Sequence, residues 1–220
     1  MASNFSPAMK ALELVFEELS GHQVVLSFGS TGKHYAQIKN GAPFDVFMAG
    51  DIERPRLLET QGLAQTDSRM TYARGKLILW TSKSGIDDIK NTLLMGKDFR
   101  HLAVANPKLS PYGMAAQQVM IKLDVWPRLQ SKLVRGENIA QTFQFVHSGN
   151  AGLGFVAYSQ VINPVRSLQG SFWVPLESLY SPIDQQAVLL TDKQAGKDLM
   201  AFLEGSLARQ IIQDYGYDVP

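Results

Sequence analysis

Apolar and polar positions along this chain of 220 residues follow two periods, one helical and one extended. Residues that recur every three or four positions predict a first helix after Ser6-Pro7: Ala8, Leu12, Val15, Phe16 and Leu19. Short, dense apolar runs predict strands over 24–28, 44–47, 76–81, 102–105, 132–135, 154–158, 172–175 and 186–190. Helical stretches are predicted between and after them, over 31–38, 51–58, from 86, over 111–123 and 139–147, around 160, and over 194–203 and 207–215. Strands that alternate with helices indicate an α/β fold with mostly parallel sheets.

The order of these elements predicts two lobes joined by a double crossover. The β-rich runs at 76–81 and 185–191 stand where a chain would leave one lobe and later return to it. We therefore expect lobe 1 to comprise 1–79 and 187–220, so that it contains both chain ends, and lobe 2 to comprise 80–186. A ligand cleft is expected between the lobes.

Composition narrows the class of protein. Apolar residues make up 45% of the chain and charged residues 19%, which is typical of a globular protein. The net charge of +1 gives no field that would favour nucleic acid, and no apolar run is long enough to span a bilayer. Cysteine is absent, which excludes disulfides, thiol catalysis and thiolate metal sites. No signal peptide is apparent at the start.

Four loops that open helices share the chemistry of a small-anion site. They are Ser3-Asn4, Ser30-Thr31, Pro111-Tyr112 and Asn138-Ile139. Each would present backbone N–H groups at the positive end of a helix, and loops beyond the carboxyl ends of strands are where open α/β sheets bind ligands. A neutral, donor-rich site suits a dianion and penalises a protonated anion, whose extra O–H would find no acceptor. The simpler alternative for Ser30 or Thr31 is a helix cap.

Other chemistries fit the residues less well. The segment Gly29–Lys33 departs from the phosphate P-loop, because Ser27 replaces the leading glycine and His34 follows the lysine. The four histidines lack metal-ligand spacing, and Asp87-Asp88 is typical of an exposed helix start. An enzyme would need a nucleophile with a base, or paired carboxylates, near the four loops, and none is found. A ligand-sensing regulator would need an output module for which 220 residues leave no room.

Several longer motifs carry a resemblance to a known family. They are Ser-Phe-Gly-Ser-Thr-Gly at 27–32, the run from Tyr35 to Phe47, Ala-Gly-Asp at 49–51, 74–80, 105–113, 153–157 and the closing Tyr215-Gly216-Tyr217. In this colinear order, over nearly the whole chain, the sequence closely resembles the periplasmic molybdate-binding proteins of ABC-type uptake systems. The resemblance implies a type II periplasmic binding protein fold, with two α/β lobes joined by two hinge strands. It also implies that the family's first strand, which should precede Ser3-Asn4, is missing.

The resemblance further implies which residues bind the ligand. In the family a tetrahedral oxyanion, molybdate or tungstate, is held by hydrogen bonds alone. The positions that match its ligand residues are Ser3, Asn4, Thr31, Tyr112 and Ile139. Thr31 replaces the usual serine, Ile139 stands where a valine donates its backbone N–H, and Ala157 stands where some members have a tyrosine, so that Tyr112 would supply the phenolic O–H.

The function implied is that of a periplasmic solute receptor that binds molybdate or tungstate and delivers it to the membrane permease of an ABC transporter. We expect no cofactor, no directly bound metal cation, no catalytic residue and no nucleic-acid partner, and we expect a monomer. Another oxyanion such as sulfate is the alternative ligand, and a phosphate- or oxyanion-handling enzyme is the less favoured alternative function.

Overall fold

The computed structural model describes residues 1–162, 164 and 168–220. The chain divides into two compact units, and we use lobe 1 for Met1–Gly75 with Asp184–Pro220 and lobe 2 for Lys76–Ile183. The ligand cleft and the lobe boundaries expected from the sequence stay predictions. In the part of the chain that is described, no helix has both the length and the apolar character needed to cross a membrane.

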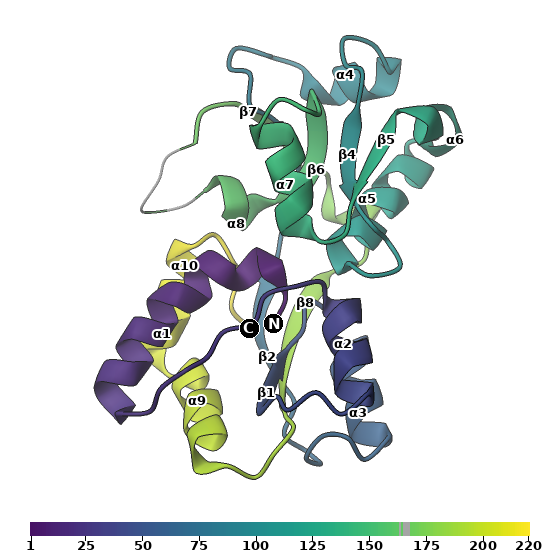
Figure 1. Ribbon diagram of the computed structural model, residues 1–220. Helices are drawn as coiled ribbons and strands as arrows, with labels where there is room; N and C mark the ends of the chain where they lie inside the picture. The colour runs from purple at the N-terminus through teal and green to yellow at the C-terminus, as the bar shows by residue number, and fades with distance from the viewer. Residues whose placement is uncertain (163, 165–167) are drawn as a thin grey trace. The chain divides into compact units, whose positions relative to one another are not determined.

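Lobe 1 is a three-stranded sheet covered by helices on both faces (Figure 1). The strand order is β1 (Val46–Met48), β8 (Ile183–Leu189) and β2 (Met70–Gly75), with β1 antiparallel to β8. One face is covered by α1 (Ser6–Ser20), which follows the short turn η1 (Ser3–Phe5), and by α9 (Gln194–Glu204) and α10 (Ser206–Asp214). The other face is covered by α2 (Thr31–Lys39) and α3 (Glu53–Thr60).

Alternation along the strands explains the two cores of lobe 1. On β8, Ala187 and Leu189 pack in the cluster formed with α1, α9 and α10, whereas Val188 packs in the cluster formed with α2 and α3. Phe47 on β1 joins Val188 in that second cluster. Successive side chains of a strand point to opposite faces, so a sheet with helices on both sides needs continuous apolar runs such as these.

Lobe 2 is a five-stranded sheet that is also covered on both faces. Its strand order is β5 (Leu133–Gly136), β4 (Leu102–Ala105), β6 (Leu153–Ala157), β3 (Leu77–Thr81) and β7 (Ser171–Trp173). The pairings make four of these strands run in one direction while β3 runs opposite, which confirms the mostly parallel prediction. The helical segments are α4 (Ile89–Met95), α5 (Pro111–Lys122), α6 (Trp126–Leu129), η2 (Gln130–Lys132), α7 (Ile139–His147), α8 (Tyr158–Val161) and η3 (Glu177–Leu179).

The strand β3 shows why lobe 2 needs both layers. Leu77 and Leu79 belong to the core that contains α5, whereas Ile78 and Trp80 belong to the core that contains Val146 of α7. All four side chains are fully buried. The dense apolar run that predicted this strand therefore reflects burial on both of its faces.

Two differences from the predicted elements lie in lobe 1. The segment 24–28 was expected to be a strand, and this prediction is wrong, because its residues form no strand ladder. Val25 is 96% exposed, so its apolar side chain is not packed into the sheet as the prediction required. The strand β2 was not predicted, since Thr71, Arg74 and other polar residues dilute its apolar pattern. This segment is a strand because it pairs with β8, and its own composition does not indicate one.

The start of the chain lies between β1 and the segment 27–29. Ala2 donates its N–H to the carbonyl of Met48 (2.9 Å), while the Met1 ammonium donates to the carbonyl of Ser27 (2.6 Å). The Gly29 N–H donates to the carbonyl of Met1 (3.1 Å), and the bridge between Ala2 and Gly29 is parallel. Residues 1–3 thus make strand-like hydrogen bonds on two sides.

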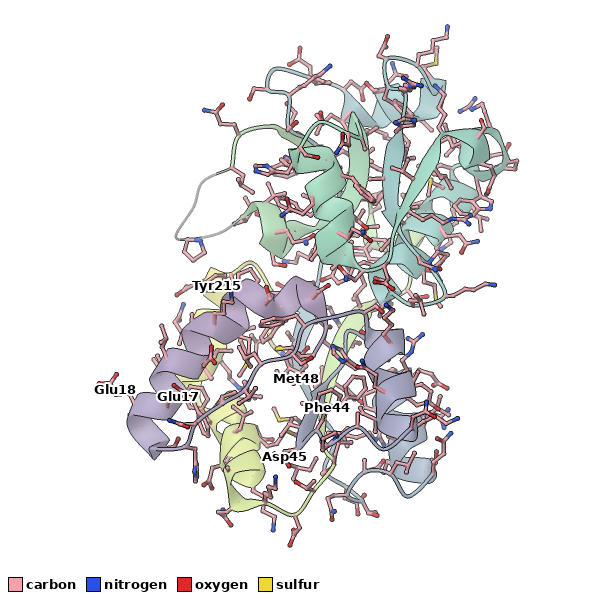
Figure 2. The ribbon with its side chains drawn as sticks, in the orientation of Figure 1. Glu17, Glu18, Phe44, Asp45, Met48 and Tyr215 are labelled. Carbon is pink, nitrogen blue, oxygen red and sulfur yellow. The ribbon has the colours of Figure 1, made fainter. Side chains whose placement is uncertain are left out.

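Next to these first residues lobe 1 contains a cavity of about 350 Å³. The segment 23–27 forms one wall, and residues 43–48 form another, along which Figure 2 labels Phe44, Asp45 and Met48. Most of the surface that lines it is apolar, with contributions from α1 and α9.

Candidate functional site

Three segments of lobe 1 are joined by hydrogen bonds of their backbone N–H groups around Ser3 and Thr31. The Ser3 N–H donates to the carbonyl of Gly29 (2.9 Å), two residues before Thr31. The Gly50 N–H donates to Oγ1 of Thr31 (3.0 Å), and the Ala2 N–H donates to the carbonyl of Met48, the last residue of β1 and two residues before Gly50. Residues far apart in the sequence are therefore brought together, and two of the predicted ligand residues are among them.

The hydroxyls of Ser3 and Thr31 are buried with donor capacity left over. Ser3 is 6% exposed, and its Oγ has no hydrogen-bond partner among the described residues. Thr31 is 2% exposed and accepts a bond from Gly50, which leaves its own O–H proton to be donated. A buried hydroxyl without a partner costs free energy, so this loop cluster is stabilised by any acceptor that reaches it.

Ser30 and Thr31 have different roles at the start of α2. Ser30 is the N-cap, and its side chain accepts from the Lys33 N–H (3.4 Å). Thr31 is the first residue of the helix, where backbone N–H groups have no partner within the helix. The cap expected as the simpler alternative is therefore present at Ser30, and it leaves Thr31 as the candidate donor.

Asn4 is held inside lobe 1 by its side-chain amide. Its Nδ2 donates to Oε1 of Gln185 (2.9 Å) and to the hydroxyl of Tyr217 (3.1 Å). Since an amide nitrogen carries two protons, both are used by these bonds. Asn4 would therefore meet an anion through its main chain and not through its amide group.

In lobe 2, Tyr112 and Ile139 lie at the starts of two helices that follow neighbouring parallel strands. Ala105 of β4 is paired with Gly136 of β5, and the Asn106 N–H donates to the carbonyl of Gly136 (2.8 Å). Because both strands end at the same edge of the sheet, the loops that lead into α5 and α7 are also neighbours.

Both lobe 2 residues are buried at helix N-termini. Tyr112 is the second residue of α5 and Ile139 the first residue of α7, with exposures of 1% and 2%. Asn138 caps α7 by accepting from the Gln141 N–H (2.9 Å). Gln160 donates to the carbonyl of Ile139 (3.1 Å), which fixes the start of α7 against the start of α8.

Charge near the lobe 1 loops is balanced. Asp51, directly after Gly50, forms an ion pair with Arg54 and also accepts the Arg54 N–H (3.0 Å). This pairing offsets a carboxylate that would otherwise repel an anion at Thr31. Within the described ranges, His, Asp and Glu side chains form no group of three or more that could hold a metal ion.

Comparison with known proteins identifies the family. Residues 1–218 match the family described as bacterial extracellular solute-binding protein, and the chain belongs to this family. It is 48% identical to the molybdate-binding protein ModA of Azotobacter vinelandii over 220 residues, which cover 99% of this chain and 87% of the relative. It is 44% identical to the molybdate-binding protein ModA of Rhodobacter capsulatus, covering 99% and 86%.

A solved structure gives the same result. The chain is similar to the periplasmic molybdate-binding protein of Azotobacter vinelandii with a TM-score of 0.95 and 40% identity, covering 100% of this chain and 97% of the other. The resemblance to periplasmic molybdate-binding proteins and the two-lobed type II binding protein fold are thereby confirmed.

No sequence pattern indicates the residues that support Asn4. Gln185 and Tyr217 lie 181 and 213 positions away from it, and no spacing rule connects them. Tyr217 belongs to the closing motif that contributes to the resemblance, but the resemblance implies no ligand contact for it. Tyr72, which bonds to Gln185 and not to Asn4 itself, lies on β2, a strand that the apolar pattern does not predict.

Proposed function

We propose that this protein is an extracytoplasmic solute receptor that binds a tetrahedral oxyanion, molybdate or tungstate, and delivers it to the permease of an ABC transporter. The observation that carries this proposal is the pair of buried hydroxyls on joined loops, Ser3 without a hydrogen-bond partner among the described residues and Thr31 with a proton to donate. The identity of 48% to a molybdate-binding protein over the whole chain supports the choice of ligand.

The proposed ligand residues are Ser3, Asn4 and Thr31 in lobe 1 and Tyr112 and Ile139 in lobe 2, all of them donating to the same anion. Uncharged donors at helix N-termini stabilise a dianion without a counter-ion, which permits its later release. The role is binding and not catalysis. We also propose that the protein acts in the periplasm as a monomer.

A site that contains only hydrogen-bond donors should bind different anions with different affinities. Molybdate, tungstate and sulfate present four acceptor oxygens at neutral pH, whereas phosphate retains a proton and would bring a donor to a site of donors. We therefore expect phosphate to bind most weakly of the four. Sulfate binding tighter than molybdate would instead favour the alternative ligand.

Titration calorimetry with the four anions tests this proposal. Thr31→Ala and Tyr112→Phe each remove one hydroxyl donor and should weaken molybdate binding by about 1–3 kcal/mol, or roughly 5- to 150-fold in Kd. The matched controls are Thr60→Ala on α3 and Tyr35→Phe on α2, whose hydroxyls bond to Leu57 and Gln61 within lobe 1. Both controls should bind as the parent does.

Two results would contradict the proposal. If the parent chain binds neither molybdate nor tungstate, the receptor function is wrong. If the parent binds but Thr31→Ala retains full affinity, the loop at Thr31 does not belong to the site.

A further inference from the structure

The closing segment of the chain places Tyr217 beneath the Ser3-Asn4 loop. After α10, Gly216 has a φ of +82°, a conformation that other residues rarely adopt, and the chain turns there. The next residues pair with β2, because the Arg74 N–H donates to the carbonyl of Asp218 (2.7 Å) and the Asp218 N–H donates to the carbonyl of Arg74 (3.1 Å). Tyr217 is therefore fixed between a turn and a strand pairing.

The Tyr217 hydroxyl contacts Asn4 twice. It donates to the Asn4 carbonyl (2.9 Å) and accepts from Asn4 Nδ2 (3.1 Å). Tyr217 is 3% exposed and Asn4 is 2% exposed, so these bonds form where water does not compete. One hydroxyl thus fixes both the main chain and the side chain of Asn4.

Gln185 and Tyr72 extend this network to the loop that contacts Thr31. Gln185 is fully buried, and its Oε1 accepts from Asn4 (2.9 Å) and from the Tyr72 hydroxyl (3.2 Å). The Tyr72 hydroxyl also lies within hydrogen-bond distance of the Ala49 carbonyl (3.1 Å), directly before the Gly50 N–H that donates to Thr31. The Tyr72 hydroxyl is protonated at neutral pH and can donate, and burial raises its pKa well above the usual value.

One buried donor of this network, Nε2 of Gln185, lowers the stability of the fold, which indicates that the position of the Gln185 amide is needed for another reason. Nε2 of Gln185 has no hydrogen-bond partner among the described residues, and burying such a donor lowers stability. An apolar residue would avoid this cost but would leave Asn4 Nδ2 without its acceptor. The amide is therefore explained by what its oxygen does for Asn4 and Tyr72.

We propose that Tyr217 and Gln185 are positioning residues of the anion site: through Asn4 and Tyr72 they fix the loops that carry Ser3 and Thr31. Neither residue donates to the anion in this scheme. The inference rests on the proposed function, since it assigns the positioning of the same donors. It also gives the closing Tyr-Gly-Tyr motif a role in binding.

The test compares Tyr217→Phe with Tyr215→Phe, which removes a hydroxyl two residues away in the same core (Figure 2). Tyr217→Phe should raise the Kd for molybdate by about 5- to 30-fold at a temperature where both variants are folded, and it should change the ratio of molybdate to sulfate affinity. Tyr215→Phe should stay within about twofold of the parent in both quantities. A purely structural role would lower the Tm of Tyr217→Phe and leave affinity and selectivity unchanged.

A double-mutant cycle tests the route through Asn4. In an Asn4→Ala background, Tyr217→Phe should change the molybdate Kd by less than about twofold, because its partner group is gone. Gln185→Met removes the other hydrogen-bond partner of the Asn4 amide. It provides the same test if Tyr217→Phe does not fold.

The outcomes separate the two proposals. Equal Kd values for the parent, Tyr217→Phe and Gln185→Met would overturn the positioning role while leaving the receptor function in place. Additive effects of Asn4→Ala and Tyr217→Phe would also overturn it. A parent chain that binds none of the four anions would overturn both proposals.

Discussion

Gly113, next to Tyr112 in α5, should not tolerate even one added methyl group. A Cβ at this position would overlap the carbonyl oxygen of Ala105 and lie 2.8 Å from its carbonyl carbon and 2.9 Å from that of Asn106. All three atoms belong to the backbone at the end of β4, so no side chain can rotate away. The helix α5 would have to move away from the sheet, and Tyr112 would move with it.

The magnitude follows from two opposing effects. Gly→Ala inside a helix gains about 1 kcal/mol of helix propensity. Overpacking a close contact costs about 1–3 kcal/mol, and a backbone clash belongs at the upper end of that range. The net loss is therefore about 2 kcal/mol, which lowers the Tm by about 4–8 °C for a chain of this size.

Gly196 in α9 provides a matched control. A Cβ there would lie 3.1 Å from Cδ2 of Leu189 and 3.4 Å from Cγ2 of Val46, both ends of side chains, and Val46 lines the lobe 1 cavity. These methyl groups have room to adjust, so the gain in helix propensity should exceed the cost of overpacking. We expect Gly196→Ala to leave the Tm unchanged or raise it by about 2–4 °C.

Thermal unfolding followed by circular dichroism measures both variants, and calorimetric titration with molybdate measures binding. Gly113→Ala should also bind molybdate more weakly, because its clash displaces the start of α5. If Gly113→Ala matches the parent in Tm, or Gly196→Ala falls as far as Gly113→Ala, the reasoning from close backbone approach is refuted.

Two further predictions concern the start of the chain. Burial lowers the pKa of His34 from about 6.5 to about 4, so the unfolded chain binds a proton more readily between these values and stability is lost as the pH falls from 6.5 towards 4. His34→Gln should reduce this loss, measured as the urea midpoint at pH 7 and pH 4.5, and an identical pH dependence in the variant would contradict the assignment. An extension of five residues ahead of Met1, with alternating valine and threonine, should fill the cavity between β1 and the segment 23–27 and raise the Tm. The same extension with proline in place of each valine should not, because proline lacks the N–H for strand pairing, and equal Tm values for the two would argue against a strand position there.

Lobe 2 shows how much of a fold local sequence can determine. Its strands β3, β4 and β6 are dense apolar runs because they are buried on both faces, and such runs are visible without any structure. Helix starts were equally visible, since Asp88 and Asn138 accept N–H bonds at the caps that their sequence positions indicate.

Lobe 1 shows where local sequence misleads. The run at 24–28 has the composition of a strand, but its residues form no ladder, whereas the more polar β2 is a strand because it pairs with β8. Whether a segment becomes a strand depends on a partner strand from elsewhere in the chain, and the composition of the segment does not indicate that partner.

The sequence by itself determined the class of fold, the helix starts and the residue types that could hold an anion, because periodicity, capping and loop chemistry are local properties. Only the tertiary structure decided that Ser3 lies beside Gly29, that Gly50 donates to Thr31, and that Tyr217 supports Asn4. These contacts join residues separated by up to 213 positions, and they exist because burial and hydrogen bonding of the folded lobe offset the entropy of bringing distant segments together.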